Sequence, residues 1–438
     1  MRDGVKDNRL LRFLRQKMIA RNNWRQFKSI RYCGSRVIKN AAVRDGVFLI
    51  TDGDDSKFFG STHCKSPWGC PVCTPMMMAR YSTDIACALD ALKKWYNQSA
   101  FMLTLTVPHT SGMTCQETTE IIYNTWKDFI THGNKNVKAN DKEGKDKRWE
   151  CHDVFASFCE TLNCKHRVRV GEYTYGSKGW HPHFHCLFWV DDDKFSHVIE
   201  WQDKFNERWL ALAKKHTLKI WNKLYPNKKE DNKIRLEIMY SKMDTEGSKG
   251  AYISVDKNGN VIKQKSSNYI CGWGGNREVT GNYQEKATNP DHMTPRQILE
   301  KAAETNDEQL YDLYFEYLLA TRIKKHARIN FSVRSGIRAI IKKWKETETY
   351  IETLKKNATN IRPWHVVVWF TEKQWLQICL LDELYECKPT LLKMARAPNA
   401  REEITAYLLD AGIDISGNGI HEMQTFLENN ILNSLGVA

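Results

Sequence analysis

The chain has 438 residues, a formal net charge of +14 at pH 7 and 13 cysteines, and no apolar run is long enough to cross a bilayer. This length predicts two or three domains with ample core. An odd number of cysteines argues against a disulfide framework. Together with the lack of a signal-peptide pattern at the start, it predicts a soluble, cytoplasmic protein with mostly free thiols.

The positive charge is unevenly distributed. From Ile361 onward the chain carries 6 Lys/Arg against 10 Asp/Glu, a net −4, so the first 360 residues carry +18. This balance favours nucleic acid as a partner over a membrane, although basic residues that only solvate a surface would give the same count. Residues 1–31 hold ten Lys/Arg and two Asp/Glu, interleaved with apolar residues at near-helical spacing. They predict a basic arm or first helix that contacts phosphate.

A cysteine cluster follows the basic segment. Cys70-Pro-Val-Cys73 is a knuckle in which two thiolates can reach one ion, and Cys64 and Cys33 can complete a tetrahedral site. The sequence therefore predicts a structural Zn²⁺ bound by four thiolates. His63 is an alternative to one of the four, and free thiols are the alternative to a metal site.

Hydrophobic periodicity predicts the elements around the centre of the chain. Helices are expected over Met76–Trp95 and Gln116–Phe129, and in an amphipathic segment that runs from Phe195 to Leu212. Strands are expected over the following ranges: Phe101–Thr106, Val154–Leu162, Arg167–Thr174 and Ile234–Tyr240.

The later segments are more helical. Thr294-Pro-Arg-Gln297 is a capping box that opens a helix, and Asn306 begins a second one. The acidic tail contains a strand, His365–Phe370, and a helix, Glu402–Leu409. These patterns predict an α+β fold with a mainly antiparallel central sheet flanked by helices, an N-terminal zinc segment and a mostly helical C-terminal region. Four domains are expected, over residues 1–98, 99–290, 291–360 and 361–438.

The stretch Gly179-Trp-His-Pro-His-Phe-His-Cys-Leu-Phe-Trp-Val190 has the strongest chemical signal. Side chains alternate along a strand, so His183 and His185 share one face. Pro182 suits a strand's start, which places His181 just before it. A hairpin can bring Glu172 beside the two imidazoles, and this set suits Mn²⁺ or Mg²⁺. The alternative is that the histidines are structural.

These residues, together with Phe101-Met-Leu-Thr-Leu-Thr106 upstream, resemble the HUH endonuclease superfamily and, within it, the plasmid rolling-circle replication initiators. The similarity runs from about Cys33 to Arg338. The resemblance implies a metal-dependent tyrosine nuclease that nicks single-stranded or hairpin origin DNA, forms a 5′-phosphotyrosyl link, frees a 3′-OH primer and later rejoins the ends. It also implies a host helicase and DNA polymerase as partners, and threonines of the upstream strand that face the site.

The resemblance assigns the nucleophile to Tyr269, in Ser-Asn-Tyr-Ile-Cys-Gly-Trp-Gly. A phenol ionises several units below an aliphatic alcohol, so it can attack phosphorus and later leave again. Gly272 stands where the family has a lysine. Tyr252, five residues before Lys257, is therefore the alternative nucleophile. Glu278 matches a glutamate that follows the family's tyrosine and is a candidate base for the termination step, or else a surface carboxylate.

Two other functions are compatible with the sequence. An HUH relaxase or transposase would share the chemistry, but the cysteine cluster ahead of the first motif favours a replication initiator. A non-catalytic, zinc-containing DNA-binding initiator would use the histidines structurally. The sequence contains no Gly-x4-Gly-Lys-Ser/Thr loop, so no ATP-driven helicase is expected in this chain.

Overall fold

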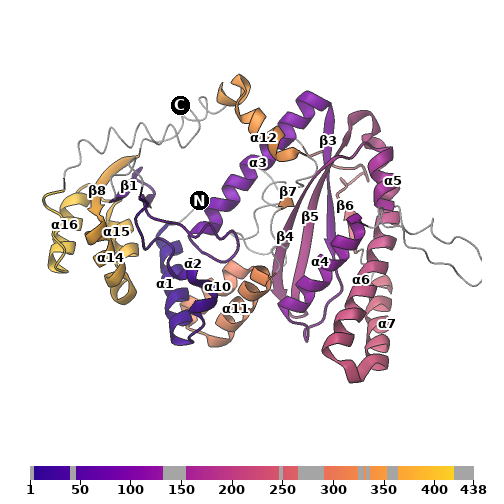
Figure 1. The fold of residues 1–438 in the computed structure, drawn as a ribbon, viewed down its shortest axis with the longest axis horizontal. Helices are drawn as coiled ribbons and strands as arrows, with labels where there is room; N and C mark the ends of the chain where they lie inside the picture. Colours follow the sequence, from indigo (N-terminus) through magenta and orange to yellow (C-terminus); the bar gives the residue numbers. More distant parts are fainter. Residues whose placement is uncertain are drawn as a thin grey trace, which may run out of the picture. The chain divides into compact units, whose positions relative to one another are not determined.

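The structure is a computed structural model that describes residues 4–39, 46–131, 154–245, 250–264, 291–323, 330–331, 336–352 and 364–418. The chain divides into two compact units (Figure 1). The first unit contains residues 1–78, 302–307 and 345–438, and the second contains 79–301 and 308–344. Each has an antiparallel sheet and several helices, which confirms the α+β prediction. Within the described ranges, no helix is both long and apolar enough to span a membrane.

The first unit is built on a sheet that joins distant parts of the sequence. Strand β1 (Gly46–Thr51) pairs on one side with β2 (Ser56–Phe59) and on the other with β8 (His365–Thr371), giving the order β2-β1-β8. Four of the six β1 side chains are completely buried. A strand with such apolar side chains must be buried. The strand predicted in the acidic tail, β8, pairs with it.

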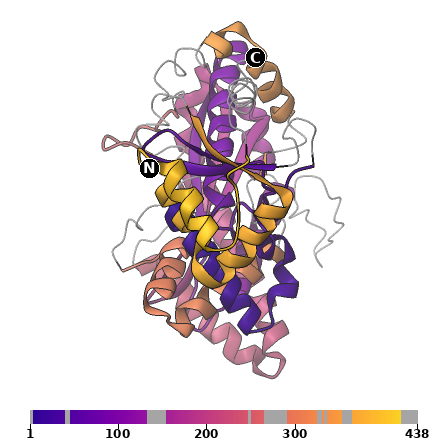
Figure 2. The ribbon, with the colours of Figure 1, turned by 90° about the vertical axis from the view of Figure 1, so that its left-hand side faces the viewer.

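Helices from both ends of the sequence complete this unit. They are α1 (Gly4–Ala20), η1 (Trp24–Phe27), α2 (Lys28–Arg31), α14 (Glu372–Tyr385), α15 (Cys387–Met394) and α16 (Ala400–Asp410). Figure 2 shows the orange and yellow helices α14, α15 and α16 grouped beside the small sheet. Trp375, Leu391 and Ile404 from these helices pack with Val47 and Leu49 in one core.

The basic first segment forms the predicted helix, but several of its arginines face the acidic tail. Arg9 and Arg12 both pair with Glu386, at 3.2 and 3.3 Å, and Arg31 pairs with Glu383 at 2.6 Å. Such half-exposed pairs contribute little stability each, about 0–1 kcal/mol. Their consequence is electrostatic, because part of the positive charge of residues 1–31 is neutralised within the chain.

The second unit contains a five-stranded antiparallel sheet in the order β6-β3-β5-β4-β7. Its strands are β3 (Gln98–Thr106), β4 (His166–Gly176), β5 (Gly179–Asp191), β6 (Ala251–Ile253) and β7 (Asn330–Phe331). Strand β5 lies in the middle and pairs with β3 from His183 to Asp191 and with β4 from Gly179 to Trp189. The strands predicted for Phe101–Thr106 and Arg167–Thr174 are confirmed.

Helices cover one face of this sheet. They include α4 (Cys115–Thr131), α5 (Val154–Thr161) and α6 (Gln202–Leu224), which follows η4 (Asp192–Trp201). Phe184, Cys186 and Phe188 point to this face and pack with side chains of all three α-helices. Because side chains alternate along β5, its histidines lie on the opposite face. The remaining elements described here are α3 (Cys73–Tyr96), η5 (Pro226–Lys228), α7 (Lys229–Thr245), α10 (Pro295–Thr305), α11 (Glu308–Ile323) and α12 (Ile337–Lys345).

Three sequence-based predictions of secondary structure are wrong. Residues 154–162 form helix α5, because Phe155 and Phe158 lie on one helical face and are buried together. The segment predicted as strand Ile234–Tyr240 lies in α7, where Leu236 and Tyr240 are buried while Ile234 is 59% exposed. In both segments the buried residues are three or four positions apart, as in a helix, and not two apart, as in a strand.

The third error concerns the start of the histidine strand. His181 and Pro182 lie inside β5, which begins at Gly179. Pairing between β5 and β3 ends at His183, so Pro182 has only β4 beside it. A proline at such an edge position breaks no ladder bond, which is why the strand continues through it.

Side chains of α6 hold the short edge strand β6 in place. The Gln202 amide accepts a hydrogen bond from the Ile253 N–H at 2.6 Å and donates one to the Ala251 carbonyl at 2.8 Å. Asn206 Oδ1 accepts from the N–H groups of Gly250 and Ala251. These amides satisfy backbone groups that would otherwise need another strand.

We predict that Gln202→Met loosens β6. The substitution keeps the side-chain length but leaves the Ile253 N–H and the Ala251 carbonyl without these partners, which should cost about 1–3 kcal/mol. Amide hydrogen exchange at residues 251–253 should accelerate. Lys219→Met, at an exposed position of the same helix, is the control and should leave exchange unchanged. Equal protection in the two variants would contradict the role of Gln202.

Candidate functional site

The polar face of the second unit's sheet carries the histidines. In register across β3, β5 and β4, Thr104 lies opposite His185, and His183 lies between Thr106 and Glu172. Directly opposed residues share a face of the sheet, so these five side chains lie together. The predicted convergence of Glu172, His183 and His185 and the orientation of the threonines therefore follow from strand register.

His185 is held from both sides. Its Nε2 lies 2.6 Å from Glu172 Oε2, and its Nδ1 lies 3.1 Å from Thr104 Oγ1. The imidazole is buried, with 9% of its surface exposed. Because the carboxylate and the hydroxyl engage the two nitrogens, the ring orientation is fixed.

His183 has different surroundings. Its Nδ1 is buried and has no hydrogen-bond partner. Burial lowers the pKa of His183 to about 4, against the opposing attraction of Glu172. The ring is therefore neutral near pH 7 and keeps a lone pair, as a metal ligand must. A buried ring nitrogen without a partner is costly, and a cation is one way to satisfy it.

Glu172, His183 and His185 are residue types that bind divalent ions, but their donor atoms do not all lie within 4.8 Å of one another. Two ligands at right angles on an ion at about 2.1 Å lie about 3 Å apart, close to the contact between Glu172 and His185. The rings of His183 and His185 lie 6.2 Å apart between centroids, so His183 must turn to complete the set. One carboxylate and two imidazoles leave positions for water or a phosphate oxygen and suit Mn²⁺ or Mg²⁺.

The predicted catalytic residues Tyr269 and Glu278 lie outside the described residues. Tyr252, the alternative nucleophile, lies on β6 opposite Thr104 and on the face of the histidines. One strand separates it from β5, which places its backbone about 10 Å from that of His185. Its side chain is 39% exposed, whereas the neighbours Ala251 and Ile253 belong to the core on the other face. Lys263, a lysine that could supply the charge missing at Gly272, pairs with Asp192 at 3.0 Å.

Sequence reasoning missed two histidines beside the site. His109 follows β3 by three residues, and its ring stacks on His181 at 4.4 Å between centroids. His292 lies 6.2 Å from His181 by the same measure. The position of His109 directly after a strand whose threonines face the site was an available signal. His292 had none, because its approach depends on a backbone bridge between Tyr175 and Met293.

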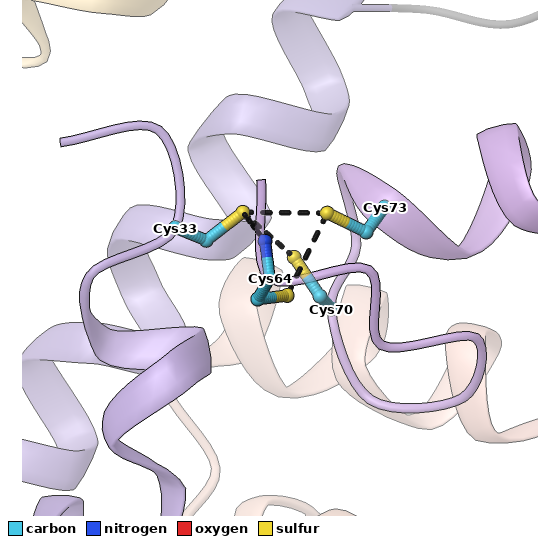
Figure 3. A group of neighbouring side chains, drawn as sticks. All are labelled: Cys33, Cys64, Cys70 and Cys73. Carbon is cyan, nitrogen blue, oxygen red and sulfur yellow. Dashed lines mark hydrogen bonds between the residues drawn. The ribbon is translucent and has the colours of Figure 1, made fainter. Parts of the chain in front are cut away.

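The four predicted zinc ligands lie together in the first unit. Figure 3 shows Cys33, Cys64, Cys70 and Cys73 pointing toward one another. The ligand atoms all lie within 4.8 Å of one another, and Cys33 Sγ is 3.4 Å from Cys73 Sγ and 3.6 Å from Cys70 Sγ. Thiolates that share a tetrahedral zinc at about 2.3 Å lie just under 4 Å apart. Among the described residues no other group of three or more ligands is this close, and the cluster could hold a metal such as zinc.

The surroundings of the cluster favour the thiolate form of Cys33 and Cys73, whereas the pKa values of Cys64 and Cys70 are raised. Backbone N–H groups of Cys64 and Ser66 lie 3.5 Å from the sulfurs of Cys33 and Cys64. Hydrogen bonds from the other three thiols lower the pKa of Cys33. His63 Nδ1 lies 3.8 Å from Cys73 Sγ, and although burial opposes it, contact with Cys33 and Cys73 raises the pKa of His63 to about 9. His63 thus borders a complete set of four sulfurs rather than replacing one.

We predict that the purified protein contains one zinc ion per chain at this cluster. Cys70→Ser should lose it, because Cys70 is completely buried between the other ligands and a neutral hydroxyl binds zinc far more weakly than a thiolate does. Elemental analysis measures the stoichiometry. Cys87→Ser, at a buried cysteine outside the cluster, is the control and should keep the ion. Zinc-free wild-type protein would rule out the assignment.

Comparisons with known proteins give little further information. No protein-family model matches the chain, and no solved structure matches it. A curated protein described as a neomycin resistance protein, from Streptomyces cyanogenus, is 26% identical over 151 residues. The match covers 33% of this chain and 34% of that protein, so the chain spans about a third of the length of this relative. The similarity does not establish a family.

Proposed function

We propose that this protein is a rolling-circle plasmid replication initiator of the HUH endonuclease type, which nicks single-stranded origin DNA. The observation that carries the proposal is the strand register that gathers Glu172, His183 and His185 on one face of the sheet. Two further features support it: the whole histidine motif lies within the described residues, and the alternating threonines of β3 share the face of the histidines. A divalent ion at these ligands would polarise the scissile phosphate and stabilise its developing charge.

The chain's own residues have separate tasks in this reaction. Thr104 and Glu172 fix the ring of His185, and burial keeps His183 neutral. The phenol oxygen of Tyr269 forms a bond to phosphorus while the bond from phosphorus to the 3′ oxygen breaks. The phenol proton is released and the 3′ oxygen gains one, so the products are a 5′-phosphotyrosine and a 3′-OH. The link conserves the phosphodiester energy, and a second transfer can rejoin the ends.

Charge supports a nucleic acid partner. The chain has a net charge of +14, and DNA binding by Lys and Arg side chains gains from counterion release. Hairpin origin DNA is the proposed substrate, and the freed 3′-OH would be extended by a host polymerase behind a host helicase. A relaxase or transposase would use the same chemistry on other DNA. The partial match to a neomycin resistance protein identifies no functional residue in this chain. We therefore do not propose that function for it.

We predict that a His183→Ala/His185→Ala variant loses nicking of a labelled single-stranded oligonucleotide that carries an origin hairpin, in the presence of Mn²⁺. DNA binding, measured by fluorescence anisotropy, should stay within about tenfold of wild type, since affinity depends mainly on distributed basic residues. His197→Ala is a matched control, because His197 is 58% exposed and pairs only with Glu200 among the interactions described. Full nicking by the double variant would refute the metal assignment. Binding without any nicking by wild-type protein would favour the non-catalytic alternative.

A second prediction identifies the nucleophile. Tyr269→Phe removes the attacking oxygen, so the covalent protein–DNA product should disappear rather than diminish. Tyr252→Phe should retain it. Mass spectrometry of the trapped adduct gives an independent assignment. An adduct on Tyr252 would show that the alternative is correct and would make Lys257 the candidate for the family's lysine.

A further inference from the structure

We propose that His109, His181 and His292 form a second metal site, which binds a transition-metal ion such as Zn²⁺ beside the Glu172, His183 and His185 set. The three residues come from separate segments: the loop after β3, strand β5 and the segment before α10. All three side chains are half-buried, so an ion from solvent can reach them. The proposal does not depend on the nicking activity.

Ring positions are close to those of imidazoles that share one ion. With metal–nitrogen distances of 2.0–2.1 Å, such rings have centroids on the order of 5 Å apart. His181 lies 4.4 Å from His109 and 6.2 Å from His292 by this measure, values that bracket the expected one, and 3.9 Å from His183 of the neighbouring set. The donor nitrogens of the three residues do not all lie within 4.8 Å of one another, so binding requires the ring of His292, the more distant of the two from His181, to move toward the others. A half-buried side chain can make this movement at low cost.

Hydrogen bonds leave lone pairs on two of these rings. His109 Nδ1 lies 3.4 Å from the Val107 carbonyl, which can only accept, so Nδ1 carries the proton and Nε2 has the lone pair. His181 Nε2 lies 2.8 Å from Thr106 Oγ1, and when it donates there, Nδ1 is available. Metal-binding histidines commonly donate their other N–H to a carbonyl or another oxygen in this way.

Two glycines make the approach of the three segments possible. A Cβ on Gly176 would lie 2.2 Å from Cδ2 of His292, and one on Gly179 would lie 3.1 Å from both Cα of Ser111 and the Thr110 carbonyl oxygen. Tyr175 and Met293 exchange two backbone hydrogen bonds, of 2.9 and 2.8 Å, which hold His292 against the end of β4. The arrangement is therefore built by the backbone and does not result from a chance contact of long side chains.

The chemistry of the donors defines the ion. Three imidazoles without a carboxylate favour Zn²⁺, Co²⁺ or Ni²⁺ over Mg²⁺ and Mn²⁺, which prefer oxygen. The exposed Lys178 in the β4–β5 turn is a nearby cation, and its long side chain can move into solvent. The two neighbouring sets thus differ in preference: one contains a carboxylate, and the other contains only nitrogen.

The test compares zinc binding by the full-length protein with that of a His109→Ala/His292→Ala variant. After equilibrium dialysis against micromolar Zn²⁺ with excess Mg²⁺, wild type should retain one more zinc ion per chain than the variant. The His197→Ala control should match wild type. With Co²⁺, the additional ion should give visible absorption without the thiolate charge-transfer bands of the cysteine cluster. Equal zinc content in wild type and the double variant would overturn the proposal.

A second variant covers the case in which the double variant fails to fold. Gly176→Ala keeps all histidines, but its Cβ displaces the ring of His292. Its backbone φ is negative, so alanine introduces no backbone strain of its own. Loss of the same single zinc ion from Gly176→Ala supports the site. Full retention in a variant that circular dichroism shows to be folded would exclude His292 as a ligand and overturn the proposal.

Discussion

The register of β3, β5 and β4 is the constraint on which the candidate site depends. A shift of one residue would turn His183 and His185 into the aromatic core and bring Phe184 to the polar face. The core prevents this, because Phe184, Cys186 and Phe188 are each no more than 1% exposed and pack against three helices. The same burial that stabilises the unit therefore determines where the imidazoles point. Glu172 and Thr104 are then correctly placed with no further adjustment, since in the paired strands Glu172 lies opposite His183 and Thr104 lies opposite His185.

The sequence was informative where local periodicity and ligand spacing decide the structure. The alternation in β5, the hairpin that returns from Glu172 and the Cys70-Pro-Val-Cys73 knuckle each involve residues close in sequence. Cys33 was also grouped correctly, because zinc coordination leaves few ways to complete four ligands. Prediction failed where tertiary packing chooses between helix and strand, as in α5 and α7, and where distant segments meet. His292 and the pairing of β1 with β8 depend on contacts that no local pattern encodes.

Electrostatics gives the two units different characters. In the first unit, arginines of the basic segment pair with Glu383 and Glu386 of the tail, so the tail reduces the positive charge that the N-terminal sequence alone suggests. Four adjacent sulfurs there need a cation or protons to offset their repulsion. In the second unit the problem is reversed: burial keeps His183 neutral, and Glu172 supplies the single negative charge beside it. One unit thus concentrates sulfur ligands and the other concentrates neutral nitrogen donors.

The small sheet of the first unit also affects how the chain can fold. Gly46 of β1 pairs with Thr371 of β8, so in sequence the whole second unit lies between two strands that are neighbours in space. Contacts this distant in sequence form slowly, because the chain must lose the entropy of closing a long loop before the strand pairing can stabilise it. During synthesis the apolar β1 hairpin must wait for β8, whereas β3, β4 and β5 can pair much earlier. The exposed edge of β1 is therefore the segment most in need of protection on the ribosome, and premature termination before residue 365 would leave it permanently without its partner.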